Sequence, residues 1–521
     1  MQRALAALLV APALLVQASA QSRLDSGVAA RIREEAHERS QVLKTVQVLT
    51  DRYGPRLTGS PNLDAAGQWA VDTMAGWGMT NGRLEPWDFG HPGWTNERLA
   101  VHLVSPVKDP LVAEVLAWTP GTNGVVRAEA VLLGLPTRPT EAELEAHLDS
   151  NAGRVQNRIV FVGSGMPAPV TLTPPPTRRL DDEVRSQFDP TRPRSRQRGV
   201  RPADTGLSAS EVERRVARFL KSNGALVRVN DGRRENGQIV AFHNSTYDVN
   251  AVVPTIVMRN EDFGRVARLV SSGTAVELEV DIVNQTHPEG RTAHNAIAEI
   301  EGSDLRHEVV MIGGHLDAWH SATGATDNAV GCAIMMEAAR ILKALNLQPR
   351  RTIRVALWSG EEQGLLGSRA YVAKHFGTSE SPTEFFRFLT AYLNVDNGTG
   401  RLRGATVFGP ATAGNRLRDM IKPLADLGLI GAISTENRSL GSSDNSSFNA
   451  AGLPGIGFSQ DPIQYETHTH HTNLDTYERI LESDVKASVT VIATLAYELA
   501  TRDERLPQFA ATQMPAPPGG R

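Results

Sequence analysis

Four short stretches in the second half of the chain place metal-ligand side chains directly after apolar runs. They are GGHLDAWH (313–320), ATDNAVG (325–331), WSGEEQGLLGS (358–368) with LNVDNG (393–398), and THHTNLDT (469–476). Imidazole and carboxylate groups are typical zinc ligands, and a pair of zinc ions requires a carboxylate that binds both. A further carboxylate must accept the proton of an attacking water. Taken together, these residue types can build a two-zinc hydrolytic site.

The order of these residues along the chain, His, Asp, Glu-Glu, Asp and His, resembles the M28 family of zinc exopeptidases, and its carboxypeptidase Q branch in particular. The resemblance implies five zinc ligands for two Zn²⁺ ions per chain. In this match His315 and Asp396 bind one ion, Glu362 and His471 bind the other, and Asp327 bridges them. The last histidine is chosen by its spacing, because the family pattern places it four residues before the Asp of HTNLDT.

The same resemblance assigns three further side chains to catalysis. Glu361 is the expected general base, and Asp317, two residues after His315, is the carboxylate that the family keeps near the metals. Some relatives carry a tyrosine before the final histidine that faces the substrate carbonyl, so His470 is a candidate donor to the oxyanion. Each motif alone is more often a solvated turn, so the prediction depends on their joint order.

Two residues beside these motifs are assigned structural roles. Cys332, the only cysteine, belongs to an apolar helical period (CAIMMEAARILKAL) and is predicted to be a packed thiol, so no intramolecular disulfide can form. Asp444 lies in GSSDNSSF, where the family commonly has Ser-Asp-His, and Asn445 replaces that histidine.

The elements that hold the motifs are expected to form an α/β sheet. After residue 250, strand-like runs alternate with helices (PTIVMRN, AVELEVDIV, AHNAIAEIE, VVMIGGH), which predicts a mostly parallel, mixed sheet covered by helices on both faces, of the zinc exopeptidase type. Ligands of such sheets collect at the carboxyl ends of the strands. Nearer the start of the chain, a helix is expected directly after Pro61.

An insert is predicted inside this peptidase domain. Between residues 111 and 250, strand-like runs (AEAVLLG, RIVFVGS, ALVRVND) surround a helix with a Ser208–Glu211 capping box, which resembles the protease-associated α+β domain of many relatives. Its segment 168–206 is rich in Pro and Arg, and it is expected to be a flexible loop without apolar anchors. The predicted division is a signal peptide (1–20), peptidase domain (21–110 and 251–505), insert (111–250) and disordered tail (506–521).

Composition limits the classes of partner. The 521 residues carry a formal net charge of −4, which gives no indication of nucleic-acid binding. Residues 1–20 combine Arg3, an apolar run and Ala-Ser-Ala, which predicts a cleaved secretory signal and a periplasmic or extracellular protein. No later run approaches the ~20 apolar residues of a membrane span. The sequence does not decide the oligomeric state, and both a monomer and a homodimer are compatible with it.

The combined prediction is an exported, zinc-dependent exopeptidase of the carboxypeptidase or dipeptidase type. It would hydrolyse peptides or dipeptides near a chain terminus through a water activated by two zinc ions, with Glu361 as general base. An M28 aminopeptidase shares every ligand and is the main alternative. The lesser alternatives are a single-zinc transferase like glutaminyl cyclase and a non-catalytic binding ectodomain, which should have lost some of the ligands.

Overall fold

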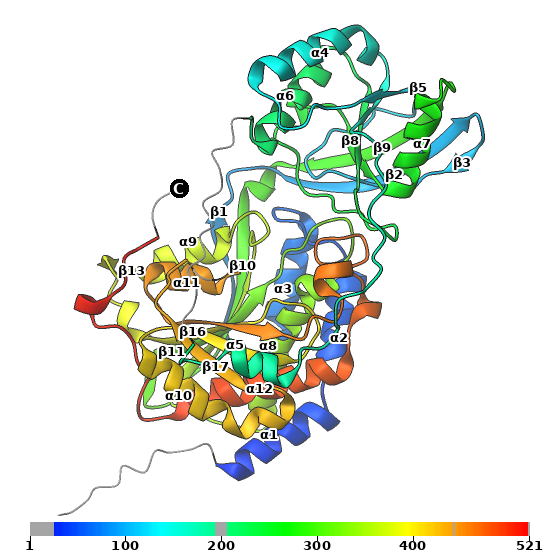
Figure 1. The fold of residues 1–521 in the computed structure, drawn as a ribbon. Helices are drawn as coiled ribbons and strands as arrows, with labels where there is room; N and C mark the ends of the chain where they lie inside the picture. The colour runs from blue at the N-terminus through cyan, green and yellow to red at the C-terminus, as the bar shows by residue number, and fades with distance from the viewer. Residues whose placement is uncertain (1–24, 193–205, 440, 442, 519–521) are drawn as a thin grey trace, which may run out of the picture.

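The computed structural model describes residues 25–192, 206–439, 441 and 443–518. The predicted signal peptide lies outside these residues. The described chain contains two eight-stranded mixed sheets, each with its own helices, and a small sheet of β13 (Gly377–Thr378) and β14 (Ser381–Pro382), and the α/β class predicted from the sequence is confirmed (Figure 1). Among the described residues, no helix has the length and apolar character needed to cross a membrane.

The first sheet has parallel strands at its centre, antiparallel pairs on either side of them, and one further parallel pair at an edge. In sheet order its strands are β1 (Thr80–Asp88), β10 (Thr292–Ile300), β12 (Arg351–Trp358), β11 (Leu305–His315), β15 (Leu389–Asn394), β18 (Gly455–Gln460), β16 (Leu402–Phe408) and β17 (Gly431–Thr435). β11 pairs in parallel with β12 and β15, and β15 pairs in parallel with β18. The carboxyl ends of these four strands therefore meet at one edge of the sheet.

Helices cover both faces of this sheet because side chains alternate between the faces along each strand. Val310 and Ile312 of β11 belong to the core on one face, whereas Val309 and Met311 belong to the core on the other. The helices of the first core are α1 (Ser26–Glu38), α2 (Val42–Gln47), α3 (Pro61–Gly76), α8 (Val330–Ala344), α10 (Ala411–Ile421) and α12 (Glu482–Thr501). Those of the second core are α9 (Leu366–His375) and α11 (Asn445–Ala451).

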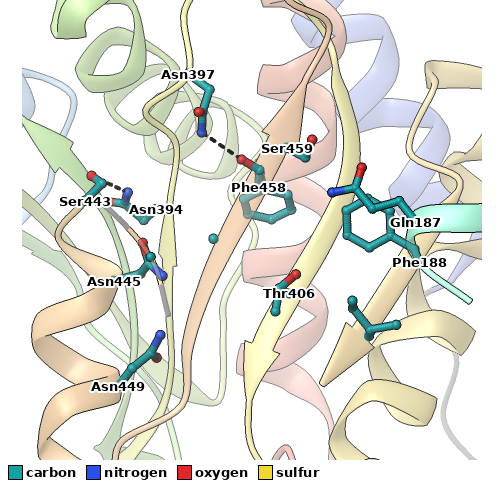
Figure 2. A pocket seen from close by; sticks show the side chains of 13 residues that line it. Gln187, Phe188, Asn394, Asn397, Thr406, Ser443, Asn445, Asn449, Phe458 and Ser459 are labelled. Atoms are coloured by element: carbon teal, nitrogen blue, oxygen red, sulfur yellow. Dashed lines mark hydrogen bonds between the residues drawn. The ribbon is translucent and has the colours of Figure 1, made fainter. Parts of the chain in front are cut away.

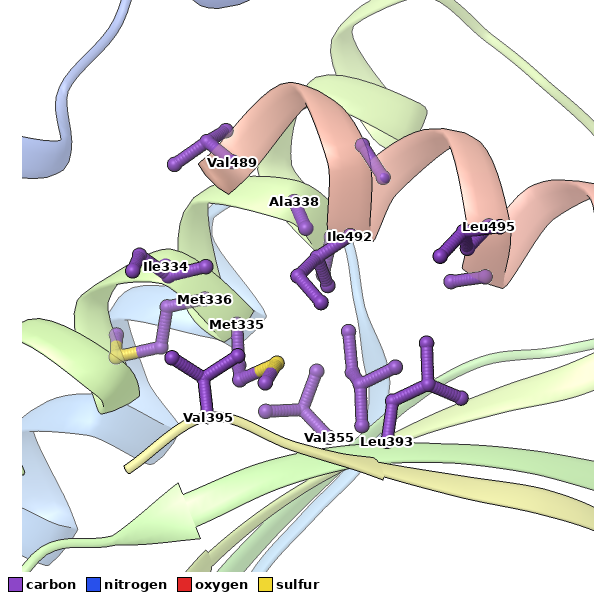
Figure 3. Packing of buried hydrophobic residues seen from close by; sticks show 14 of the residues in the cluster. Ile334, Met335, Met336, Ala338, Val355, Leu393, Val395, Val489, Ile492 and Leu495 are labelled. Carbon is purple, nitrogen blue, oxygen red and sulfur yellow. The ribbon is translucent and has the colours of Figure 1, made fainter. Parts of the chain in front are cut away.

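The larger core joins the two central helices to the strands that carry the site. Figure 3 shows Met335 and Met336 of α8 and Ile492 of α12 above Val355 and Leu393 of the sheet. All five side chains are fully buried, and so is the thiol of Cys332 on α8, as predicted. Helix α3 begins at Pro61, one residue earlier than predicted, with Ser60 as its N-cap.

The second sheet is formed by residues between 93 and 287. In sheet order its strands are β3 (Asp109–Pro110), β2 (Gly93–Ser105), β9 (Glu277–His287), β5 (Val126–Leu133), β6 (Ile159–Val162), β7 (Val227–Asp231), β8 (Thr255–Met258) and β4 (Ala113–Val115). The helices that pack against this sheet are α4 (Glu141–Val155), α6 (Ala209–Ser222) and α7 (Asn260–Ser271). Ser208 caps α6 by accepting the N–H of Glu211, at 3.2 Å. The identity of this region as a protease-associated domain stays a proposal.

Two strand-like runs lie in a different sheet from the one expected. PTIVMRN and AVELEVDIV contain β8 and β9, and both strands belong to the second sheet. An apolar period identifies a strand but not its partner, so the sequence could not assign these runs to a sheet. A domain boundary at residue 250 would consequently divide the second sheet.

A segment of the second region, residues 177–188, leaves its sheet and docks on the first. The N–H of Ile463 donates to the carbonyl of Thr177 at 3.1 Å. Arg178 forms ion pairs with the carboxylates of Asp461 and Asp484, both buried. Polar contacts of this kind tie the segment to the loop after β18 and to the start of α12.

The docked segment also has apolar anchors. Val184 of the short helix α5 (Asp181–Gln187) is fully buried, and Phe188 is 5% exposed, both against Ile433 of β17. Figure 2 shows Gln187 and Phe188 on one side of a pocket of about 530 Å³, with Asn394 and Asn445 on the other. The expectation that this stretch lacks apolar anchors is wrong here, because Val184 on α5 and Phe188, the residue that caps the end of this helix, are four residues apart and reach the same partner. Residues 193–205 of the predicted loop lie outside the described residues.

Replacing Phe188 with alanine should release the docked segment. Removing a buried phenylalanine costs about 3 kcal/mol or more, and cleavage by a protease tracks the population of the opened form. We expect trypsin to cut after Arg178 and Arg185 at least about tenfold faster in Phe188→Ala than in the wild type. The exposed Phe385 provides the control variant, Phe385→Ala. Equal cleavage rates in all three proteins would show that Phe188 is no anchor.

The tail also differs from the prediction of disorder after residue 505. Leu506 is buried, and Phe509 lies 5.4 Å from Phe408 between ring centres. The side chain of Gln508 donates to the carbonyl of Leu389 at 2.8 Å. Isolated apolar residues in a proline-rich tail need no core of their own when a folded surface accepts them, which the sequence alone does not show.

Candidate metal centre

Strand ends position most of the predicted ligands. His315 is the last residue of β11, Glu361 and Glu362 follow the end of β12 at Trp358, and Asp396 follows the end of β15 at Asn394. Since these strands are parallel neighbours, their ends lie side by side. The other two ligands come from loops. Asp327 lies in the turn η4 (Ala325–Ala329) before α8, and His471 lies just after the turn η7 (Tyr465–Thr469).

The two carboxylate oxygens of Asp327 face two different pairs of side chains. On one side, Nε2 of His315 lies 3.1 Å from Oδ1 of Asp327 and 3.2 Å from Oδ1 of Asp396. On the other, Nε2 of His471 lies 3.1 Å from Oδ2 of Asp327 and 3.0 Å from Oε2 of Glu362. The structure thus brings the five predicted ligands together, in the grouping that the resemblance implies. Their roles stay predictions.

The donor atoms fit a zinc centre. Ligand atoms of His315, Asp327 and Glu362 all lie within 4.8 Å of one another. One buried carboxylate oxygen, Oε1 of Glu362, accepts no hydrogen bond from the described residues, and Oδ2 of Asp327 has only the imidazole of His471 within hydrogen-bonding distance, at 3.1 Å. Such an oxygen is costly to bury unless a cation compensates it. Nitrogen and oxygen donors in this mixture are those that zinc prefers.

Burial and mutual repulsion shift the pKa values of the carboxyl groups. Burial raises the pKa of Glu361 well above its usual range, and the negative charge of Asp396 adds to the effect. Burial and the charge of Asp327 raise the pKa of Glu362 to about 7. Burial alone would lower the pKa of His471, but its contacts with Asp327 and Glu362 raise it to about 10. The cluster therefore concentrates negative charge that a divalent cation would balance.

Asp317 orients the residues around it and is fully buried. Its two carboxylate oxygens accept the backbone N–H groups of Glu361 and Glu362, each at 3.2 Å, and Oδ2 also accepts the hydroxyl of Thr58 at 3.1 Å. Its backbone carbonyl lies 2.9 Å from Nδ1 of His315. Because a carbonyl only accepts, Nδ1 carries the proton and Nε2 remains free to bind a metal. Asp317 thus acts as a positioning residue.

His470 lies at the edge of the centre. Its Nε2 is 3.9 Å from Oδ2 of Asp327, farther than that of His471, and its ring centre is 3.8 Å from the ring of His471. These distances favour His471 over His470 as the ligand, and its assignment stays a prediction. His470 is about one-third exposed, so its side chain can reach a bound substrate, and its role as an oxyanion donor stays a prediction.

Two functional residues were missed from the sequence. Asp475 accepts the backbone N–H groups of Thr326 and Asp327, at 2.6 and 3.0 Å, and so holds the turn that carries the bridging carboxylate. Burial raises its pKa to about 7. The sequence THHTNLDT contains this Asp four residues after His471, but only its spacing from the histidine entered the prediction.

Arg56 is the second missed residue, and it is fully buried. Its guanidinium donates five hydrogen bonds of 2.7–3.0 Å to backbone carbonyls. The acceptors are Leu49, Gly54, Leu316, Thr323 and Gly324. Three of them lie in the segment that joins His315 to Asp327. In the sequence, the only indication of this role is a charged arginine within the otherwise uncharged stretch YGPRL.

Comparison with known proteins places this geometry in a family. Residues 295–496 match the model for peptidase family M28. This part of the chain is an M28 peptidase domain. The range contains all five predicted ligands and Glu361, and the resemblance stated from the sequence is confirmed. The domain matched is that of a hydrolase family of metallo-exopeptidases.

Relatives of the M28 domain also match outside it. Carboxypeptidase Q of Mus musculus is 25% identical over 464 residues, which cover 88% of this chain and 86% of the relative. The crystal structure of a peptidase M28 precursor from Shewanella amazonensis is 25% identical, with a TM-score of 0.65, and covers 93% of this chain and 98% of that one. A zinc aminopeptidase from Bacillus subtilis, 16% identical with a TM-score of 0.55, covers 91% and 97% and shares the fold.

Proposed function

We propose that this protein is an exported, zinc-dependent exopeptidase that hydrolyses the peptide bond next to a chain terminus. The observation that carries the proposal is the position of Asp327, whose two oxygens each face a separate histidine–carboxylate pair at 3.0–3.2 Å. A bridging carboxylate between two such pairs is the arrangement that two metal ions require. The Bacillus subtilis relative is described as a zinc aminopeptidase, which supports zinc as the metal.

The residues of the site divide the chemical work. Zinc bound by the two groups would lower the pKa of water and polarise the substrate carbonyl. Glu361 is not part of either ligand group, and its backbone is fixed by Asp317. Its carboxylate is therefore free to take the proton of the attacking water and to deliver it to the leaving amine. His470, at the exposed edge, would donate to the developing oxyanion.

The terminus recognised is proposed to be the carboxylate, with the free amine as the alternative. Carboxypeptidase Q matches over 88% of this chain, whereas the Bacillus subtilis aminopeptidase is similar in fold alone. The test is to compare hydrolysis of one dipeptide with its amine blocked, its carboxylate blocked, or both free. A carboxypeptidase hydrolyses the amine-blocked form, an aminopeptidase the carboxylate-blocked form, and a dipeptidase only the free form. Hydrolysis of none of the three would contradict the proposal.

Metal content provides an independent prediction. The purified, zinc-loaded protein should contain two ions per chain, measured by elemental mass spectrometry, because Asp327 offers one oxygen to each group. A strong chelator should abolish peptidase activity, and added Zn²⁺ should restore it. One ion per chain would favour instead the single-zinc, glutaminyl-cyclase-like alternative.

A further inference from the structure

The second region of the chain reaches the metal centre through residues 237–243. Asn473, two residues after His471, holds this segment by three hydrogen bonds. Its N–H donates to the carbonyl of Ile239 at 3.1 Å, its Oδ1 accepts the N–H of Ile239 at 2.8 Å, and its Nδ2 donates to the carbonyl of Gly237 at 3.2 Å. Ile239 is fully buried. The segment therefore has a defined position beside the loop that carries the ligand.

Two aromatic side chains form a wall next to His471. The ring centre of Phe242 lies 5.2 Å from that of His471 and 5.1 Å from that of Trp319, both in edge-to-face geometry. Trp319 lines a small cavity together with Asp327, Glu362 and His471. The wall thus combines a residue of the M28 domain with one from the second region.

The exposure of Phe242 is unusual for a side chain that only joins two parts of a protein. It is 40% exposed, whereas Trp319, which it contacts, is buried. The indole N–H of Trp319 is buried and has no hydrogen-bond partner among the described residues. A buried donor without an acceptor is costly, unless a ligand supplies the acceptor. An exposed ring and an unused donor beside a metal ligand are together typical of a substrate subsite.

We propose that Phe242 and Trp319 form the subsite for an apolar substrate side chain, above all an aromatic one, on a residue next to the scissile bond. The inference rests on the proposed peptidase function and adds the class of side chain to it. Aromatic rings favour edge-to-face and offset contacts with a further ring, which the exposed face of Phe242 offers. The second region thereby contributes to substrate choice.

The first test compares matched dipeptides, Gly-Gly, Phe-Gly and Gly-Phe, with the zinc-loaded protein. Phe242→Ala should lower kcat/KM for one of the phenylalanine dipeptides by about 10-fold to 100-fold, the range of an altered apolar pocket. For Gly-Gly the change should be under about twofold, because glycine has no side chain to fill the subsite. Phe242→Leu should recover part of the loss. Phe385→Ala, which removes an exposed ring elsewhere, should change neither value.

A binding measurement separates the subsite from the peptidase reaction. Phenylalanine hydroxamate and glycine hydroxamate are titrated calorimetrically into wild type and Phe242→Ala, each loaded with zinc. Phenylalanine hydroxamate should bind the wild type at least about tenfold more tightly than glycine hydroxamate does, and Phe242→Ala should lose that preference. If the wild type hydrolyses no dipeptide but keeps this preference, the proposed function fails and the subsite stands. No preference in the wild type, or equal losses for all ligands in the variant, would overturn the subsite.

Discussion

Replacing Glu361 with glutamine should lower kcat by at least about 10²–10⁴-fold, the contribution of general acid–base catalysis. Glutamine keeps the size and hydrogen bonding of the side chain but cannot accept the proton of water. Both zinc ions should stay bound, because neither ligand group around Asp327 includes Glu361. Steady-state kinetics and metal analysis of the same preparation check the two halves of this prediction.

The neighbouring Glu362 provides the matched comparison. Its Oε2 lies 3.0 Å from His471, and its Oε1 has no donor among the described residues. Glu362→Gln should therefore weaken zinc affinity, and excess Zn²⁺ should restore part of its activity without restoring Glu361→Gln. The opposite behaviour of the two variants would reverse the assignment within the pair. Full activity of both would remove the basis for the two-zinc mechanism.

Replacing Arg56 with methionine should cause the largest loss of stability. The substitution removes a donor from five backbone carbonyls, and a buried carbonyl that is left without any partner costs about 1–3 kcal/mol. We expect the free energy of unfolding to fall by more than about 4 kcal/mol, a value reserved for severe core defects. Zinc affinity should fall as well, since three of the acceptors lie between His315 and Asp327.

The control for this variant is Arg52→Met, four residues earlier. Arg52 is exposed, so its replacement should change the free energy of unfolding by no more than about 0.5 kcal/mol. Urea unfolding and zinc titration of both proteins provide the comparison. Similar stability of the two variants would mean that water replaces the guanidinium of Arg56, and that the ligand loop does not depend on it.

The sequence predicted the elements around the site because their signals are local. Apolar runs in VVMIGGH and IRVALW indicated strands, and the polar residues that follow them pointed to the edge at which parallel strands end. Within the second region, AEAVLLG, RIVFVGS and ALVRVND likewise correspond to β5, β6 and β7. A period of two or of 3.6 residues is a property of one segment, and it needs no knowledge of the partner.

Features that depend on a distant partner were missed. Val184 and Phe188 are anchors only because Ile433 lies under them. The guanidinium of Arg56 needs carbonyl acceptors about 260 residues away in addition to those near it in the sequence. The assignment of β8 and β9 to the second sheet follows the same rule. Contacts between residues far apart in the chain produce no periodic pattern in a single amino-acid sequence.

The docked segment 177–188 limits how modular this protein is. Arg178 lies in the second region, yet its partners Asp461 and Asp484 are buried carboxylates of the peptidase half. Deleting the second region would remove the Arg178 guanidinium from these two buried carboxylates, and buried charges that lose a partner are destabilising. The deletion would also expose the apolar side chain of Ile433 to solvent. A stable shortened protein would therefore need substitutions at the residues that the deletion exposes. Gain or loss of such a region during evolution requires coordinated change at sites far apart in the gene.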